Sequence, residues 1–540
     1  MNSDHQSFHV TVTAPLAAAL VARDGLTAPE PVPAVTLQAA RRLAVIGEAA
    51  AAVGWAERLA GQREVTIVVA APVDLPEEAA FAVLVAPAPV LSGHLGAFRV
   101  DGAAAPAEFD VVLDLSPQPL LRRVELPQGY AAPGRDPLDQ ALAVIDLLAF
   151  EGEFEKPRYV ALKERTCAHS RARKAGCSNC IEVCATQAIT GAGESVSIDP
   201  YLCQGCGTCA TVCPSGAIAY QYPRVADTGL AIKKQLVAFR QAGGSDPLLL
   251  FYSAEAGRRL LAERRRAGQG LPAHVIPVET WSADAVGLDL LLGSVALGAT
   301  RVAVLGAGSH DLAPLQRQAA LGQAILGGLG YGGEFLRIVD VDRGDWPADL
   351  AAWVPPAGPP AAEFHLLADK RTTLEFVIDH LAKQAPAAPA AVDLPAGAPF
   401  GMVAVSDACT LCMSCVGACP AGALKAAADA PRLSFLERNC VQCGLCANTC
   451  PEGAVTLTPR LLVQDRRQER ILREAEIFRC TACGKPMGAA PTIERMLAQL
   501  SGHSMFATPA AKARLTMCGD CRVVDLIQNE GSLKASEMTE

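Results

Sequence analysis

The sequence predicts a multidomain protein of mixed class, α/β plus α+β. Its 540 residues exceed the usual size of one domain, and about three to four domains are expected. Two stretches alternate short apolar runs with helical patterns, which is typical of small parallel α/β domains. Two further stretches carry repeated cysteine runs, and a last stretch carries two cysteine pairs. Each of these three should form a small module around its cysteines.

Composition limits the possible functions. Hydrophobic residues make up 51% of the chain, enough for several buried cores, and the net charge of −9 disfavours a nucleic-acid-binding surface. No long apolar stretch is free of charge, so no membrane span is expected. Residues 1–30 lack the basic and apolar segments of a signal peptide. Twenty cysteines in ligand-like spacings need reducing surroundings, which favours a cytoplasmic location.

The N-terminal third predicts a Rossmann-like α/β domain. Residues 1–35 are rich in Ala and Pro and are expected to be mobile. Between residues 36 and 150, strands are predicted at 43–46, 65–69, 81–85 and 109–113, with a helix at 49–60. The first strand ends at Gly47, but the next two positions of a G-x-G-x-x-G turn hold Ala49 and Ala52. The domain therefore lacks a nucleotide fingerprint and is interpreted as structural.

Two complete cysteine runs near the C-terminal end have the spacing C-x2-C-x2-C-x3-C-P. They are Cys409, Cys412, Cys415 and Cys419, followed by Cys440, Cys443, Cys446 and Cys450. In a two-cluster module the fourth cysteine of each run binds the other cluster. One [4Fe-4S] cluster is therefore expected on Cys409, Cys412, Cys415 and Cys450, and a second on Cys440, Cys443, Cys446 and Cys419.

A second pair of runs lies earlier in the chain. Cys203, Cys206, Cys209 and Cys213 repeat the full spacing, whereas the run Cys177, Cys180 and Cys184 has Lys174 where its first cysteine would stand. Cys167 lies seven residues before that position, within a basic insert. We expect one cluster on Cys203, Cys206, Cys209 and Cys184. The other is expected on Cys167, Cys177, Cys180 and Cys213, with a three-iron or modified cluster on the last three as the alternative. The basic insert is interpreted either as a solvated loop or as a docking site for an acidic partner.

Each pair of runs resembles a bacterial two-cluster ferredoxin. The resemblance covers residues 165–222 and 405–458, and each fourth cysteine is followed five residues later by an aliphatic side chain. It implies two ferredoxin-like 2[4Fe-4S] modules, which we place at residues 151–224 and 401–465. Together they would hold four [4Fe-4S] clusters.

Residues 225–384 predict a second parallel α/β domain. Strands are expected at 248–252, 275–278, 301–305 and 335–339, with helices at 254–266, 284–296 and 314–329. The pattern resembles the small delta-type domain of methyl-viologen-reducing hydrogenase, which is also fused to some heterodisulfide reductase subunits. Members of that family carry cysteines for a [2Fe-2S] cluster, but this chain has no cysteine between Cys213 and Cys409. The domain is therefore expected to be a spacer or a docking element without a cofactor.

The remaining segments are a linker and a C-terminal element. Residues 385–400 are rich in Ala and Pro and predict a semi-stiff linker. Residues 466–540 hold two C-x2-C pairs, Cys480 with Cys483 and Cys518 with Cys521, which suit tetrahedral zinc in a zinc-ribbon-like element. A single iron or an iron–sulfur cluster remains the alternative, and a helix is expected at 492–500.

The order of these parts resembles multi-cluster ferredoxins that are often encoded beside molybdenum-dependent formate dehydrogenases. The residues that carry this resemblance lie at 152–159 and after Cys167 and Cys203. It implies a redox protein partner, with formate dehydrogenase as the candidate. We expect a non-catalytic electron carrier, or a subunit of an oxidoreductase, with no catalytic residues of its own. The alternatives are a subunit of a flavin-dependent or bifurcating complex and a redox-sensing assembly factor.

Overall fold

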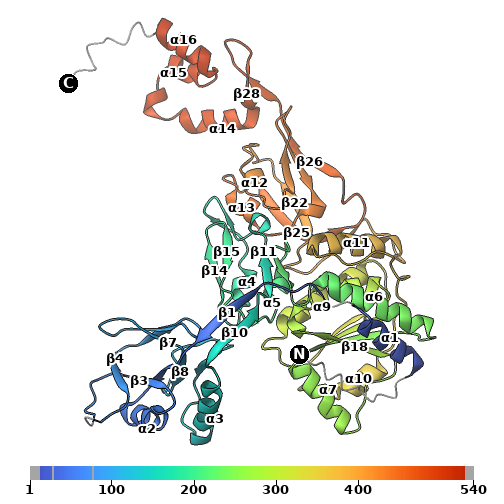
Figure 1. The fold of residues 1–540 in the computed structure, drawn as a ribbon. Helices are drawn as coiled ribbons and strands as arrows, with labels where there is room; N and C mark the ends of the chain where they lie inside the picture. The colour runs from blue at the N-terminus through green and yellow to red at the C-terminus, as the bar shows by residue number, and fades with distance from the viewer. Residues whose placement is uncertain (1–12, 27–28, 76–77, 344, 530–540) are drawn as a thin grey trace.

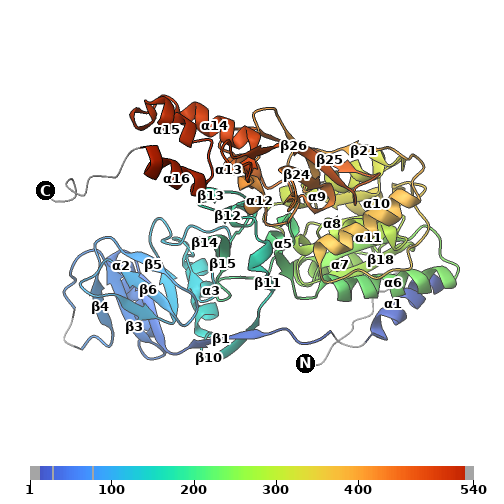
Figure 2. The ribbon, with the colours of Figure 1, turned by 90° about the horizontal axis from the view of Figure 1, so that it is seen from above.

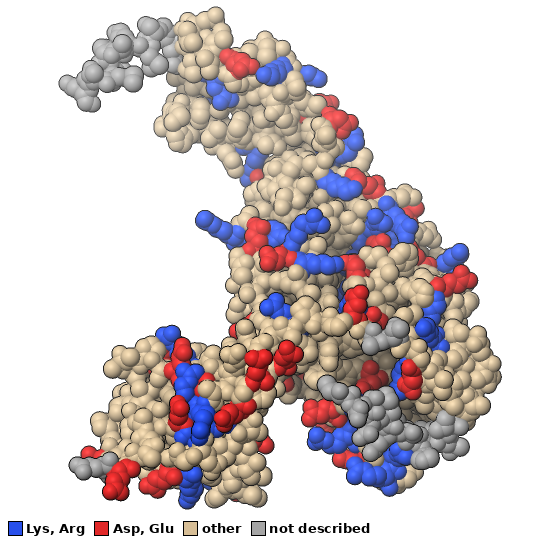
Figure 3. All heavy atoms as spheres, in the orientation of Figure 1, with Lys and Arg blue, Asp and Glu red and all other residues tan. Residues whose placement is uncertain are grey.

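The computed structural model describes residues 13–26, 29–75, 78–343 and 345–529. Mixed helices and strands form two α/β domains, two cysteine modules and a C-terminal element. The two cysteine modules lie between the N-terminal α/β domain and the C-terminal element (Figure 1). The second α/β domain lies beside both cysteine modules, as the view from above also shows (Figure 2). Basic and acidic side chains are interspersed over the face seen in Figure 3. In the described part of the chain no helix is long and apolar enough to cross a membrane.

The N-terminal α/β domain is built on a five-stranded sheet with the order β4-β3-β2-β8-β9, in which every neighbouring pair is parallel. Its strands are β2 (Arg42–Ile46), β3 (Glu64–Val69), β4 (Ala82–Val85), β8 (Val111–Asp114) and β9 (Tyr130–Ala131). Helices α2 (Ala49–Leu59) and α3 (Pro137–Leu148) pack on this sheet. An antiparallel sheet of β5 (Val90–Ser92), β6 (Phe98–Asp101) and β7 (Ala107–Phe109) was not predicted.

One predicted strand of this domain is divided in two. The apolar run at 109–113 breaks at Asp110, which is buried and pairs with Arg42 at 2.7 Å. The backbone N–H and the guanidinium of Arg42 both donate to the Asp110 carboxylate. Because that carboxylate ties the start of β2 to the chain before β8, the residues before it join the antiparallel sheet instead.

The second α/β domain has a four-stranded parallel sheet with the order β18-β17-β19-β20. Its strands are β17 (Leu248–Ser253), β18 (Val275–Thr280), β19 (Arg301–Leu305) and β20 (Leu336–Val339). The helices are α6 (Val225–Gln241), α7 (Ala256–Arg266), α8 (Leu288–Ala296), α9 (Ala313–Gly328), α10 (Trp346–Ala352) and α11 (Lys370–Lys383). The predicted helix at 284–296 is split into the short η2 turn (Ala283–Ala285) and α8. Every residue of α8 is buried, so this helix lies in the centre of the domain.

The N-terminal segment differs from the expected mobile chain. Residues Ala14–Asp24 form helix α1, which packs against α6, and Leu16 and Ala19 are buried in the core of the second α/β domain. Farther along, β1 (Ala34–Ala39) pairs antiparallel with β10 (Gly152–Pro157), at the start of the residues assigned to the first cysteine module. Burial of the apolar face of α1 explains why this segment is ordered. Residues 1–12 and 27–28, which belong to the same expectation, lie outside the described residues.

The first cysteine module has two separate antiparallel pairs of strands. They are β11 (Val160–Leu162) with β16 (Ile218–Tyr220), and β14 (Ile189–Ala192) with β15 (Ser195–Ile198). Two short helices, α4 (Asn179–Glu182) and α5 (Thr208–Val212), carry cysteines. The insert before Cys177 contains the turn η1 (Glu164–Thr166) and a small hairpin of β12 (Ser170–Arg171) and β13 (Lys174–Ala175).

The second cysteine module repeats this plan with two added strands. Its own strands are β22 (Gly401–Val405), β23 (Leu424–Ala426), β24 (Arg432–Leu436) and β25 (Val455–Leu462), with helices α12 (Ser414–Gly417) and α13 (Leu445–Thr449). The added strand β21 (Ala391–Asp393) pairs with β25, and the added strand β26 (Glu469–Glu474) pairs with β24. The module therefore extends beyond residue 465, where its end was predicted.

The prediction that residues 385–400 form a separate linker is wrong, because this segment packs against two domains. Its strand β21 joins the sheet of the second module, and Val392 is buried in the core of the second α/β domain. The N–H groups of Val463 and Gln464 both donate to the carbonyl of Ala390. These contacts fix the segment between two domains, even though its Ala- and Pro-rich composition is typical of a linker.

The C-terminal element contains a hairpin and helices. They are β27 (Ile477–Arg479), β28 (Pro486–Ala489), α14 (Ala490–Leu500), α15 (Pro509–Arg514) and α16 (Gly519–Asn529). Helix α14 includes the predicted helix at 492–500. Its Thr492 hydroxyl donates to the carbonyl of Thr410, and Arg495 pairs with Glu452 at 3.0 Å. The element therefore contacts the second cysteine module next to Cys409 and Cys450.

Candidate functional site

The second cysteine module encloses two cavities, each lined by one of the predicted ligand sets. One cavity is lined by Cys409, Cys412, Cys415 and Cys450. The other is lined by Cys419, Cys440, Cys443 and Cys446. The last cysteine of each run thus lies in the cavity of the other run. This crossed arrangement is the one that the spacing predicts for a two-cluster module.

Burial disfavours the thiolate form of two of these cysteines, Cys415 and Cys446. Burial, and then the neighbouring thiols of Cys409, Cys412 and Cys450, raise the pKa of Cys415 to about 11. Burial, followed by the thiols of Cys440, Cys443 and Cys419, raises the pKa of Cys446 to about 12. Metal ligation requires thiolates, so binding a metal cluster here must release protons.

The altered run of the first module brings together the four predicted cysteines. Burial raises the pKa of Cys180 to about 12, with further contributions from the thiols of Cys213, Cys177 and Cys167. Cys167 is buried, and its N–H donates to the carbonyl of Glu164 in the η1 turn. The Cys167 thiol therefore lies close enough to those of Cys177 and Cys180 to raise their pKa values, although it is distant from their run in the sequence.

The other set of the first module is Cys184, Cys203, Cys206 and Cys209. Burial places the pKa of Cys209 well above its usual value, and the thiols of Cys206, Cys203 and Cys184 raise it further. Aromatic rings cover the loop between these cysteines. A Cβ atom at Gly205 would lie 2.5 Å from the ring of Tyr159, and the hydroxyl of Tyr220 donates to the Gly205 carbonyl at 2.7 Å. Gly205 has a φ of 81°, so both its conformation and its lack of a side chain are required.

A repeated backbone hydrogen bond reaches the last cysteine of each run. The N–H of the residue four positions later donates to sulfur at Cys184, Cys419 and Cys450, over 3.2 to 3.3 Å. At Cys213 the donor is the N–H of Ile218, at 3.5 Å. The donors lie in the Gly-Ala-aliphatic phrase, or its variant, that follows every run. Hydrogen bonds to cluster sulfurs are one way in which a protein adjusts reduction potential.

The four ligand sets follow one another in space, and the two modules touch. Cys180 is among the thiols that raise the pKa of Cys209, Cys443 acts in the same way on Cys177, and Cys415 does so on Cys446. At the contact between modules, the side-chain amide of Asn448 donates to the carbonyl of Ala175 at 2.8 Å. We name each set after one of its cysteines. In order, they are the Cys203 set (Cys184, Cys203, Cys206, Cys209), the Cys177 set (Cys167, Cys177, Cys180, Cys213), the Cys443 set (Cys419, Cys440, Cys443, Cys446) and the Cys412 set (Cys409, Cys412, Cys415, Cys450).

The basic insert lies at this contact. Its Arg171 donates to the carbonyls of Ser170 and Glu194 and lies near enough to Cys443 to lower the pKa of that thiol, although burial raises it overall. A Cβ atom at Gly176 would lie 2.7 Å from the side chain of Leu445. The insert thus docks onto the second module of the same chain, which neither interpretation of its sequence had named.

Carboxylates from two domains approach the Cys203 set. Burial raises the pKa of Asp284 to about 6, and a hydrogen bond from the Ser309 hydroxyl opposes this effect. Glu125 comes from the N-terminal α/β domain, is half-buried and lies 3.7 Å from His310. Both carboxylates add to the raised pKa of Cys206. No sequence motif indicated this cluster, because its members come from three distant segments.

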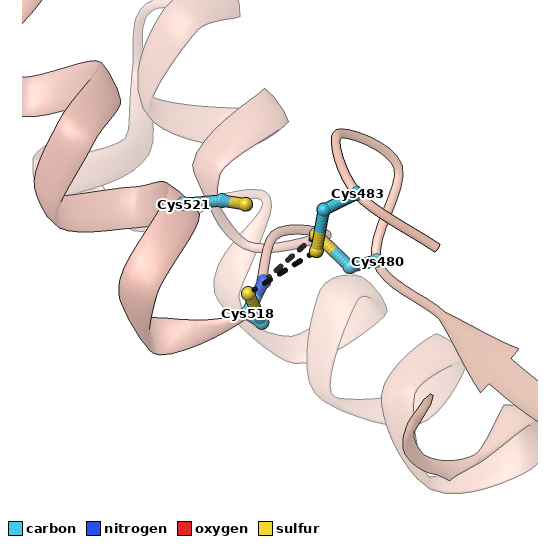
Figure 4. A group of neighbouring side chains, drawn as sticks. All are labelled: Cys480, Cys483, Cys518 and Cys521. Carbon is cyan, nitrogen blue, oxygen red and sulfur yellow. Dashed lines mark hydrogen bonds between the residues drawn. The ribbon is translucent and has the colours of Figure 1, made fainter. Parts of the chain in front are cut away.

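The C-terminal cysteines form a compact group (Figure 4). The sulfurs of Cys480, Cys483, Cys518 and Cys521 lie within 4.8 Å of one another, and those of Cys483 and Cys518 are 3.7 Å apart. A tetrahedral zinc with Zn–S bonds of about 2.3 Å separates its sulfurs by about 3.8 Å. The N–H of Cys518 donates to the sulfur of Cys480. This hydrogen bond is the main reason that the pKa of Cys480 is lowered to about 6. The four sulfurs therefore suit a single tetrahedral ion.

Comparison with known proteins identifies the two cysteine modules. Residues 175–217 and 408–454 each match the family described as the 4Fe-4S dicluster domain. No curated protein matches the chain. The first match begins after Cys167, so the insert lies outside the matched segment. Two dicluster domains with these cysteine motifs support [4Fe-4S] clusters in an iron–sulfur protein of ferredoxin-like character.

Proposed function

We propose that this protein relays single electrons through four [4Fe-4S] clusters. The observation that supports the proposal is the contact of the two dicluster modules through Asn448 and Ala175. This contact would let electrons pass from the ligand sets of one module to those of the other. Cys167, Cys177, Cys180 and Cys213 would hold the second of the four clusters, and the other three sets would hold the rest. Bound in this way, the clusters supply one-electron chemistry at each site.

The chain's own residues contribute ligation and position. The backbone N–H groups after each run donate to the sulfur of its last cysteine and stabilise negative charge there. The two α/β domains act as a frame that fixes the modules and supplies charged groups near the Cys203 set. We infer no catalytic residue, and the donor and acceptor would be separate redox proteins. The sequence resemblance suggests a redox enzyme such as formate dehydrogenase as the partner. The twenty cysteines in ligand-like spacings suggest a cytoplasmic location, because they need reducing surroundings.

We propose a structural zinc at the C-terminal cysteines. The sulfur spacing supports a single tetrahedral ion, and four cysteines leave no open coordination position. Zinc has no redox change, so this site would anchor the C-terminal hairpin and helices beside the last cluster without carrying electrons. A single iron would fit the same sulfurs, and metal analysis distinguishes the two.

An electron count tests the relay. Anaerobically purified protein would be titrated with dithionite and followed by visible absorbance. Four clusters that each accept one electron predict about four electrons per chain. A count near two would remove one module from the relay. A flavin spectrum in the purified protein would favour an oxidoreductase subunit instead.

A further inference from the structure

The first module has an open groove where the second module carries an extra strand. A cavity of about 480 Å³ lies between strands β11 and β15, and Cys203 forms part of its wall. These strands belong to different sheets, and β15 pairs only with β14 in the part of the chain that the structure describes. In the second module the equivalent strand, β24, lies between β23 and β26. The edge of this sheet is therefore covered by β26 in the second module, whereas among the described residues the corresponding edge of β15 is free in the first.

The two modules can be aligned through their strand registers. Leu162 pairs with Ile218 in the first module, and Val405 pairs with Val455 in the second. Ile189 pairs with Ile198, and Leu424 pairs with Phe435. These pairs anchor the alignment, and counting along each strand from them gives further corresponding positions in the two modules. The corresponding pairs are Val160 with Val403, Glu164 with Asp407, Ser197 with Ser434, and Pro200 with Glu437.

All four of these positions contact β26 in the second module. Arg470 donates to the Val403 carbonyl at 3.0 Å and lies 3.5 Å from Glu437. The Ser434 hydroxyl donates to Glu469. Arg473 pairs with Asp407 at 3.1 Å. Their four counterparts in the first module all line the open cavity.

Glu164 and Arg158 are the charged residues that line the groove, and comparison with the second module indicates what Glu164 would bind. Glu164 keeps the acidic charge that Asp407 uses to bind Arg473, and Ser197 keeps the hydroxyl of Ser434. Lys425, which pairs with Glu469 beside Ser434, corresponds to the neutral Thr190. An added strand would therefore gain most from a basic side chain opposite Glu164. Backbone pairing along a free sheet edge supplies affinity, and the side chains set the register.

We propose that the groove between β11 and β15 is a docking site for an extended segment of a redox partner, which adds to β15 as an antiparallel strand and presents a basic side chain to Glu164. This inference rests on the proposed electron relay and names one end of it. Because Cys203 lines the groove, the docked strand would bring the partner beside the first cluster of the series. The occupant takes the place that β26 takes in the second module.

The test uses a peptide copy of residues 465–476, Asp-Arg-Arg-Gln-Glu-Arg-Ile-Leu-Arg-Glu-Ala-Glu, and the full cluster-loaded chain. We expect one peptide to bind per chain, and Glu164→Arg to weaken binding about fivefold to tenfold. A peptide with glutamate in place of Arg473 should bind Glu164→Arg better than it binds the wild type. The matched control is Asp407→Arg in the second module, which should leave peptide binding unchanged because its own β26 fills that groove.

Several outcomes would overturn the proposal. One is absence of peptide binding. Others are equal binding by wild type and Glu164→Arg, or a loss of binding in Asp407→Arg, which would show exchange with β26. Concentration-dependent dimers that Glu164→Arg abolishes would make a second copy of this chain the occupant. Iron content and dithionite reduction of Glu164→Arg are measured alongside. If these stay normal while peptide binding fails, the docking site is wrong and the relay stands.

Discussion

Lys370 and Arg371 are adjacent in sequence, yet their side chains hold different cysteine modules. The Lys370 amine donates to the carbonyls of Ala210 and Thr211 in the first module, at 2.9 and 2.7 Å. The Arg371 guanidinium donates to the carbonyls of Arg438 and Cys440 in the second, at 2.7 and 3.2 Å. Both side chains extend from the start of helix α11, so one helix end of the second α/β domain fixes the spacing between the modules.

Replacing Arg371 should destabilise the second module. Its guanidinium also lies over the ring of Phe400, and burial lowers its pKa to about 10. Arg371→Leu would leave carbonyl groups without donors, which costs about 1–3 kcal/mol for each buried group. Thermal loss of the visible cluster absorbance should begin at lower temperature. Arg467→Leu is the control, because its ion pair with Asp379 is exposed and worth at most about 1 kcal/mol. Equal effects of the two changes would contradict the bridging role of Arg371.

Separating the modules should interrupt the relay without removing a cluster. A side chain at Gly176 would lie 2.3 Å from the Ala168 carbonyl and 2.7 Å from Leu445, so Gly176→Val should push the insert away from the second module. Iron content should stay near that of the wild type, while the magnetic coupling of reduced clusters seen by EPR weakens. Asn448→Ala should act in the same direction with a smaller effect. Gly270→Val is the control, because no atom lies within 4 Å of a Cβ there. Unchanged coupling in Gly176→Val would exclude this contact as the path.

Stability should depend on the ionisation of Asp284. Burial raises the pKa of its carboxyl from 3.8 to about 6, so the folded protein binds a proton that the unfolded chain releases. The resulting stabilisation is complete below pH 4 and is lost as pH rises through 6, by about 2–3 kcal/mol. Asp284→Asn should abolish this part of the pH dependence of urea unfolding, whereas the exposed Asp342→Asn should not. A wild-type profile that matches that of Asp284→Asn would show that the carboxyl titrates normally.

The C-terminal site and the cluster sites should respond differently to loss of a ligand. Cys480→Ala should lower zinc content and destabilise the C-terminal element, because zinc binding and folding of such knuckles are coupled. The visible spectrum and the electron count should change little. Cys443→Ala should instead reduce iron content and electron uptake. Loss of an iron signal in Cys480→Ala, with no zinc in the wild type, would identify an iron centre.

Local sequence patterns predicted most of the elements and the grouping of the cysteines. A ligand run is encoded within a few residues, and the apolar periodicity of strands such as β17 and β19 is equally local. Pairings between distant segments left no such signal. Strand β26 joins β24 from outside the predicted module, and Leu16 of α1 enters the core of a domain more than 200 residues away.

Composition misled where a few side chains decide the structure. The Ala- and Pro-rich segment at 385–400 predicted a linker, but Val392 is buried and the Ala390 carbonyl binds two backbone N–H groups. The insert around Cys167 showed basic charge and an unusual spacing, yet its contact with Asn448 could not be read from either. The bridging residues Lys370 and Arg371 likewise lie in a helix whose sequence resembles any surface helix.

Iron analysis of the wild type and of Cys167→Ser tests the central claim most directly. Four [4Fe-4S] clusters predict about 16 iron atoms and 16 sulfides per chain. If Cys167 is a ligand, the variant should fall to about 12 irons, or to about 15 if a three-iron cluster remains, with the other three clusters intact by EPR. Ser170→Ala in the same insert should keep the wild-type content. About eight irons in the wild type would contradict the four-cluster relay, and an unchanged iron content in Cys167→Ser would remove that cysteine from the ligand set.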